Sequence, residues 1–124
     1  MRNSLLLLLL FLSGYASAHS WTPTYPVFKP SYMDRVLETE MLLFNKREDV
    51  EYFEVMVTDE DFNKLPFVST NRIYKASYLE RVKVQIFIRE EMLFKAMYIC
   101  SRSRFLKQEI PTNMVSSRIC SKIR

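Results

Sequence analysis

The sequence predicts an α+β domain in which one N-terminal helix packs on an antiparallel sheet of about four to five strands. Two observations support this fold class. Residues 31–46 carry apolar side chains at helical spacing, and most segments after residue 50 alternate apolar with polar side chains, as half-buried strands do. A helix followed by a run of strands is typical of an α+β arrangement.

Residues 1–18 have the organisation of a signal peptide. Arg2 supplies the positive start, an apolar run covers residues 5–12, and the small residues Ala16 and Ala18 predict cleavage after Ala18. The run is shorter than the roughly 20 residues that span a bilayer. An uncleaved anchor is the less favoured alternative, because no charged stop-transfer pattern follows. We therefore expect a secreted, extracellular protein with no membrane span.

The chain after the signal peptide is one basic domain. It has 124 − 18 = 106 residues, and without Arg2 it carries 17 Lys and Arg against 14 Asp and Glu, a net charge of +3. This length suits a single domain. The charges are mixed along most of the chain, which is unlike the footprint of a nucleic-acid-binding protein, so no nucleic-acid partner is expected.

Residues 19–30 form an extended leader in this interpretation, and the domain proper covers residues 31–124. Pro23, Pro26 and Pro30 each fix the backbone and lack an N–H donor, which disfavours a helix. The aromatic residues between them either lie along the domain, which we favour, or meet a partner.

The predicted helix covers residues 31–46. Ser31 can cap its first turn, and Asp34 follows three residues later as in a capping box. An apolar stripe at helical spacing would face the sheet. Its members are Met33, Val36, Leu37, Met41 and Phe44.

The first predicted strand covers residues 50–58, because Phe53, Val55 and Val57 alternate with more polar residues. The acidic residues 59–61 are interpreted as a solvated loop rather than a cation site, since no glycine turn or following oxygen ligands accompany them. A second short strand, with weaker alternation, is expected within residues 72–78.

The strongest strand prediction is residues 81–89. The apolar residues Val82, Val84, Ile86 and Ile88 share one face there, and mostly polar residues share the other. A return strand is predicted over residues 93–103, and a last strand around residues 114–120.

Two absences argue against an enzyme. The only glycine is Gly14, inside the signal peptide, so the domain cannot form a glycine-rich phosphate loop or a nucleophile elbow. The only histidine is His19, which leaves no acid–base pair for a ribonuclease-like reaction. Two cysteines and one histidine are too few for a closed zinc site. We expect no enzyme activity, no cofactor and no metal, although paired-carboxylate hydrolysis stays formally open.

Cys100 and Cys120 are the only cysteines. In an oxidising compartment a disulfide between them is the default, and closing a loop of this length stabilises a fold by roughly 3 kcal/mol. The alternative of two reactive thiols has no Cys-x-x-Cys spacing and no activating histidine in its favour.

These features together resemble the secreted (type 2) cystatins. The residues that carry the resemblance are Phe44-Asn45-Lys46, Lys95-Ala96 ahead of Cys100, and the separation of Cys100 from Cys120. The match covers residues 32–46 and 79–122. The resemblance implies a five-stranded sheet wrapped around the helix.

In inhibitory cystatins a glycine, a Gln-x-Val-x-Gly hairpin and a Pro-Trp hairpin enter the cleft of papain-like proteases. Here no glycine remains, residues 80–84 do not match the first hairpin, and Gln108 and Glu109 stand where Pro-Trp would be. The resemblance therefore implies a cystatin-like binding protein without classical cysteine-protease inhibition. The alternative is an inhibitor of a papain-like protease with a non-standard wedge.

The last part of the chain is basic, and it supplies the candidate binding residues. From residue 102 onward, six Lys and Arg face one acidic residue. This bias indicates either a solvated face or a site for a protein partner or an anionic surface. The candidates are Arg102, Arg104, Lys107, Gln108, Glu109, Arg118, Lys122 and Arg124.

Overall fold

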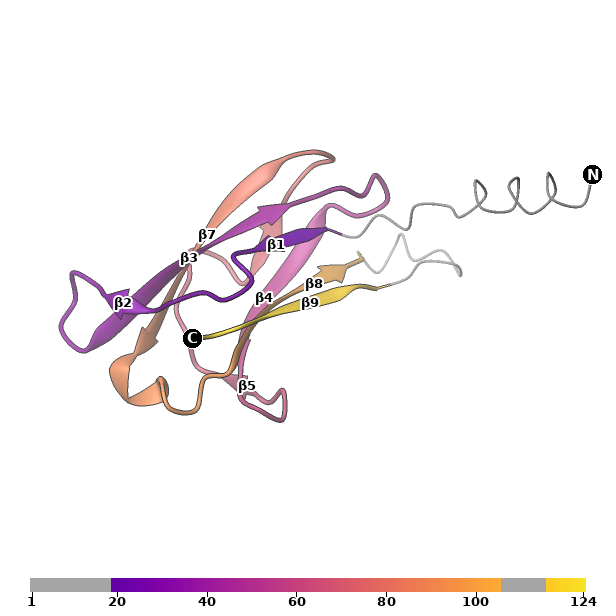
Figure 1. The fold of residues 1–124 in the computed structure, drawn as a ribbon. Helices are drawn as coiled ribbons and strands as arrows, with labels where there is room; N and C mark the ends of the chain where they lie inside the picture. The colour runs from indigo at the N-terminus through magenta and orange to yellow at the C-terminus, as the bar shows by residue number, and fades with distance from the viewer. Residues whose placement is uncertain (1–18, 106–115) are drawn as a thin grey trace, which may run out of the picture.

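The computed structural model describes residues 19–105 and 116–124, which form a sandwich of two β-sheets (Figure 1). In this part of the chain the only helical segment is the three-residue 3-10 turn η1 (Glu90–Met92). The predicted α+β fold, with a helix on a sheet, is therefore wrong. The protein is an all-β sandwich in its described residues.

Sheet A is organised around one long strand. Strand β3 (Val36–Phe44) pairs antiparallel with β7 (Arg81–Arg89) along its whole length. Its other side pairs with two short strands in turn, β1 (Ser20–Thr22) and β2 (Lys29–Pro30). Both short strands lie within residues 19–30, so this segment contributes to sheet A.

Sheet B has β4 (Tyr52–Thr58) and β8 (Tyr98–Arg104) at its centre. The short strands β5 (Lys64–Leu65) and β6 (Ile73–Lys75) pair with the two ends of β4 on its outer side. The last strand, β9 (Arg118–Lys122), pairs antiparallel with β8 and stands at the opposite edge of the sheet.

The segment predicted as a helix is a turn followed by β3. Thr39, Met41 and Leu43 are buried at a period of two, which is the strand repeat. The helical interpretation failed because Thr39, a buried polar residue, interrupts the apolar alternation. Ser31 closes a turn instead of capping a helix: the N–H of Met33 donates to its Oγ at 3.1 Å.

The predicted strands agree better with the structure than the predicted helix does. Residues 81–89 form β7 as predicted, and the strand predicted over residues 50–58 is confirmed as β4. The other three strands exist but are shorter or shifted. Their observed bounds are Ile73–Lys75, Tyr98–Arg104 and Arg118–Lys122.

The core lies between the two sheets. Large buried side chains enter it from both sides, and the most completely buried of them are Met41, Leu43, Phe53, Val55, Val57, Val84, Ile86 and Ile99. Trp21 of β1 adds a polar link, because its Nε1 donates a 3.0 Å hydrogen bond to the Ile99 carbonyl of the other sheet.

Asn45 is a buried polar residue that joins three segments just after β3. Its Nδ2 donates to the carbonyls of Val50 at 2.7 Å and Ala76 at 2.8 Å, and its Oδ1 accepts the N–H of Arg47 at 2.8 Å. Its main chain also bonds to residues 79 and 80. A side chain assigned to a family motif is thus a structural cross-link of this sandwich.

Candidate functional site

The candidate site is the outer edge of β9. In an antiparallel pair, the backbone groups of alternate residues point toward the partner strand and away from it. Ser103 donates its N–H to the Ser117 carbonyl at 2.9 Å, and Ile123 donates to the Met97 carbonyl at 2.8 Å. By this alternation, Ile119 and Ser121 also bond to β8.

The backbone N–H and C=O groups of the intervening residues therefore point away from the sheet. These residues are Arg118, Cys120 and Lys122. Just beyond the strand, Arg124 follows the same alternation, and its N–H donates to the Pro26 carbonyl at 3.0 Å. Within residues 19–105 and 116–124, no strand pairs with this edge. Among the described residues, none bonds through its backbone to the outward groups of these three residues, which is the arrangement of an open sheet edge.

The disulfide Cys100–Cys120 holds this edge strand in place. The two cysteines are cross-strand partners, and their Cα atoms are 4.0 Å apart. Such a short separation belongs to a non-hydrogen-bonded pair. This agrees with the outward direction of the Cys120 backbone groups. The bond also fixes the register of β9 against β8.

Most of the predicted basic candidates share one surface. Arg102 and Arg104 of β8 lie on the same face of sheet B as Arg118 and Lys122 of β9, opposite the core. Arg124 lies beyond β9, with its guanidinium 5.5 Å from the centre of the Tyr25 ring. The remaining candidates, Lys107, Gln108 and Glu109, are outside the described residues.

Three of the cations on this face share one carboxylate. Glu54 of β4 accepts from Lys64 and Arg102 at 2.9 Å each, and Arg104 lies 3.3 Å away. Burial alone would raise the pKa of Glu54. The hydrogen bonds and charges of Lys64 and Arg102 outweigh that effect and hold the pKa below its ordinary value. One negative charge cannot neutralise three positive ones, so the face keeps a positive excess.

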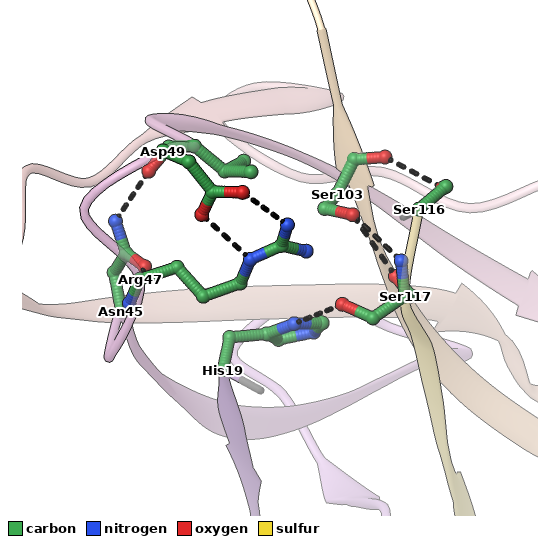
Figure 2. Close-up of polar contacts among 8 residues, drawn as sticks. His19, Asn45, Arg47, Asp49, Ser103, Ser116 and Ser117 are labelled. Atoms are coloured by element: carbon green, nitrogen blue, oxygen red, sulfur yellow. Dashed lines mark hydrogen bonds and ion pairs between the residues drawn. The ribbon is translucent and has the colours of Figure 1, made fainter. Parts of the chain in front are cut away.

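A buried polar cluster secures the start of β9 (Figure 2). The His19 ring lies between two serines, and its Nε2 is 2.6 Å from Ser101 Oγ. Figure 2 shows the other contact, in which Nδ1 lies 3.2 Å from Ser117 Oγ. The N–H of Ser117 also donates to Ser103 Oγ at 2.8 Å. The ring of Phe53 packs against the imidazole, with ring centres 4.8 Å apart. Together these contacts tie the N-terminal strand to β8 and β9.

The environment of His19 explains why this cluster is structural. Burial lowers its pKa to about 4, against a weaker opposing effect from the Ser101 hydrogen bond, and the nearby Arg47 lowers it further. The ring is therefore neutral near pH 7. Ser101 is fully buried, and His19 is almost so. Arg47 is engaged by Asp49 at 2.5 Å.

Sequence reasoning missed the roles of His19, Asn45 and the serines. No local pattern indicates these roles, because important partners are distant in the sequence: His19 and Ser117 are 98 residues apart, and Asn45 and Ala76 are 31 residues apart. Only the composition gave a hint of the role of His19. A single histidine close to an apolar residue such as Trp21 is more often a buried, hydrogen-bonded core residue than a catalytic one.

Residues 19–105 and 116–124 contain neither a cluster of metal-ligand side chains nor a helix suited to span a membrane. There, no three His, Cys, Asp or Glu side chains come together in a way that would hold a metal ion. The same stretch contains no helix with the length and apolar character needed to cross a bilayer.

The fold resembles solved structures of periplasmic pilus chaperones. The E. coli chaperone DraB is 18% identical, with a TM-score of 0.60 over 86% of this chain and 53% of that one. The Salmonella enterica structure of the SafA pilin in complex with the SafB chaperone gives 10% identity and a TM-score of 0.65, over 90% and 55%. The periplasmic chaperone SfaE gives 12% identity and 0.56, over 86% and 56%.

These likenesses overturn the predicted cystatin resemblance and, with it, the protease-inhibitor family, and they give no support to a papain-like partner. The cysteine separation that carried the resemblance closes a β-hairpin here, and a hairpin occurs in many folds. No protein-family model matches the chain, and no curated protein matches it. The chain spans about half the length of the chaperones it resembles. What it shares with them is the immunoglobulin-like, two-sheet fold.

Proposed function

We propose that this protein is an exported, chaperone-like binding protein that takes up an extended segment of a protein partner along the outer edge of β9. The observation that carries the proposal is the row of outward backbone groups on Arg118, Cys120 and Lys122. An added strand would satisfy them by main-chain hydrogen bonds, which is a recurrent mode of peptide recognition. The proposal is of a binding role, not of an enzyme.

Three further observations support it. One structural neighbour is a chaperone in complex with a pilin, which makes a protein partner plausible for this fold. The neighbours are periplasmic chaperones, and residues 1–18 read as a signal peptide, which supports export to an oxidising compartment. Finally, the Cys100–Cys120 bond keeps β9 in register while its outer side is open.

The long edge strand of sheet A, β7, is less suited to pair with a partner strand. On the outer side of β7, Phe87 exchanges two backbone hydrogen bonds with Val68, each 2.9 Å long. Ser69 Oγ donates to the Gln85 carbonyl at 2.6 Å. These contacts cover the middle of that edge, which is one way in which proteins block strand addition.

The test is amide hydrogen exchange by NMR on the exported, disulfide-bonded protein. The probes are extended 11-residue peptides with one apolar face, which differ in the charge of the other face. At least one peptide should slow exchange at Arg118, Cys120 and Lys122. Exchange at Ile119 and Ser121 should change little, because both already bond to β8. The amide of Lys83 on β7 serves as an internal control.

A variant pair sharpens the test. Lys122→Pro removes an outward N–H and leaves the ladder to β8 intact, so it should abolish the protection at Arg118 and Cys120. Lys122→Gln removes the charge alone and should retain the alternating pattern. If no peptide at 1 mM protects the three amides, or if Lys83 is protected instead, the assignment of the β9 edge is wrong.

A further inference from the structure

The face of sheet B that points away from the core carries basic side chains on four of its five strands, and the central strand β4 contributes Glu54. In the described residues, six Lys and Arg lie on it with one Glu, a net charge of 6 − 1 = +5. The basic residues are Lys64, Lys75, Arg102, Arg104, Arg118 and Lys122. Figure 1 shows β8 and β9, which contribute four of them, running side by side. A strand added to β9 would extend this face.

One of the two cations on β9, Arg118, is held in place by aromatic side chains. The Arg118 guanidinium lies 4.9 Å from the centre of the Phe62 ring. Phe62 in turn stacks on Tyr98 of β8, with ring centres 4.8 Å apart and an interplanar angle of 11°. Such a stack restrains a long side chain before any partner arrives, which lowers the entropy lost on binding.

The acidic loop 59–61 borders this face at the end of β4 but does not neutralise it. The carboxylate of Asp59 accepts the N–H groups of Asp61 and Asn63, both at 2.9 Å. That carboxylate is therefore turned into its own loop. Even with all three loop acids counted, the balance is 6 − 4 = +2. On the face of sheet B that points away from the core, a strand added beside β9 would therefore meet positive charge.

The opposite side of β9 has a different character. Ile119 and Ile123 are partly buried and pack against the core cluster, and Ser121 between them is buried. A strand added at this edge alternates its side chains in the same way. One of its faces would therefore adjoin apolar residues, and the other would adjoin Arg118 and Lys122.

Charge also argues against a second copy of this chain as the occupant. Antiparallel pairing of two β9 strands about Cys120 places Arg118 of one copy opposite Lys122 of the other, twice. Like charges directly opposite each other destabilise a strand pair, and opposite charges stabilise it. Pairing of β9 with β9 of a second copy is therefore unfavourable, and pairing of β9 with an acidic strand is favourable.

We propose, on the basis of the strand addition proposed above, that the partner segment is an alternating strand with acidic side chains opposite Arg118 and Lys122. These two positions are four residues apart on one face of the added strand. The residues between and beside them on the other face are apolar. The partner pattern is thus acidic–apolar–any–apolar–acidic, a segment that is neither wholly apolar nor basic.

The experiment compares three 11-residue peptides that share one apolar face and carry Glu, Gln or Lys at the two outward positions. The Glu peptide should bind about fivefold more tightly than the Gln peptide, and the Lys peptide about fivefold more weakly, for two cross-strand pairs. Titration by NMR gives the affinities, and amide exchange reports the site. The preference should shrink in 0.5 M salt, where charges are screened.

A charge-reversed protein provides the matched control. The double variant Arg118→Glu, Lys122→Glu should invert the order of the Glu and Lys peptides. Lys29→Glu, on the edge strand β2 of the other sheet, should leave that order unchanged.

The outcomes separate the two proposals. If all three peptides protect Arg118, Cys120 and Lys122 with equal affinity, strand addition stands and the acidic pattern is wrong. If no peptide protects these amides, the assignment of the binding site to the outer edge of β9 is wrong. Preferential binding of the Glu peptide without protection of these amides would overturn both proposals. Protection that depends on protein concentration in the absence of peptide would also overturn both, because it indicates that a second copy of the chain occupies the edge.

Discussion

The imidazole Nε2 of His19 lies 2.6 Å from the hydroxyl oxygen of Ser101, across the interior between the first strand and β8. The two residues are 82 positions apart, and both are buried. The other ring nitrogen meets Ser117 at the start of β9. The strand that offers the open edge is therefore anchored by a titratable group that must stay neutral.

This arrangement predicts a loss of stability in mild acid. Burial lowers the pKa of His19 from 6.5 to about 4, so between these values the unfolded chain binds a proton that the folded chain does not. The contribution is fully present above pH 6.5 and is lost as the pH falls toward 4. Urea unfolding should show a decrease of about 1–2 kcal/mol between pH 7 and pH 5.

The control for this prediction is His19→Asn. This variant should be less stable at pH 7, but its free energy of unfolding should not change between pH 7 and pH 5. Two ion-paired carboxylates, Glu54 and Asp49, do not interfere in that window. The pKa values of Glu54 and Asp49 are held below their ordinary values, so their contributions disappear at lower pH. An unchanged pH slope in the variant would contradict the assignment to His19.

The sequence could predict those strands whose alternation is local and complete. Strand β7 repeats apolar and polar residues over nine positions, and its bounds were predicted correctly. Strand β3 satisfies two periods at once: Val36, Leu37 and Met41 fit a helix, whereas Leu37, Met41 and Leu43 fit a strand. Only packing against β7 decides between them. Thr39 hid the strand pattern because it is polar and buried.

The turns gave no signal because they contain no glycine. Arg35, Phe62 and Leu79 adopt positive φ angles near 60°, where glycine is usually found. The four basic residues on one face of sheet B could be predicted as a group but not as a face. Their alignment depends on the register between β8 and β9, which the disulfide and the Ser117 contacts fix.

Leu79→Gly should stabilise the protein. A leucine at φ 63° is strained by contact between its Cβ and the backbone, at a cost of about 1–2 kcal/mol. Glycine removes this strain but gains flexibility in the unfolded chain, so the net gain should be roughly 0.5–1 kcal/mol. The side chain of Leu79 is more than half exposed and contributes little packing. Thermal unfolding measures the change.

The neighbouring substitution Tyr78→Gly is the matched control. Tyr78 is exposed to a similar degree but has no positive φ, so glycine should destabilise there. Equal effects at the two positions would mean that backbone strain at Leu79 is not the cause.

The packing of β7 gives a second pair of variants. Ile86 is fully buried between the sheets, so Ile86→Ala should lower the free energy of unfolding by roughly 2–5 kcal/mol. Gln85 faces outward and bonds through its side chain to Glu40 on the exposed side of sheet A. Gln85→Ala should cost less than about 0.5 kcal/mol. Urea unfolding of both variants checks the register, and similar losses would show that it is wrong.

Asn45→Ala should be among the most damaging single substitutions outside the apolar core. It leaves the carbonyls of Val50 and Ala76 and the N–H of Arg47 without the partners they have now. Asn45 is fully buried, and stranded polar groups there lose the compensation for their desolvation, so the expected loss is roughly 2–4 kcal/mol.

Asn45→Asp tests the direction of these bonds. A carboxylate keeps the size and the acceptor of the amide but turns two donors into acceptors that face carbonyl oxygens. At pH 7 it should therefore destabilise at least as strongly as alanine, because it adds a buried charge. Asn71→Ala, at an exposed position, should stay within about 0.5 kcal/mol of the unsubstituted protein. A mild effect of Asn45→Asp in chemical denaturation would show that donation to Val50 and Ala76 does not hold these segments together.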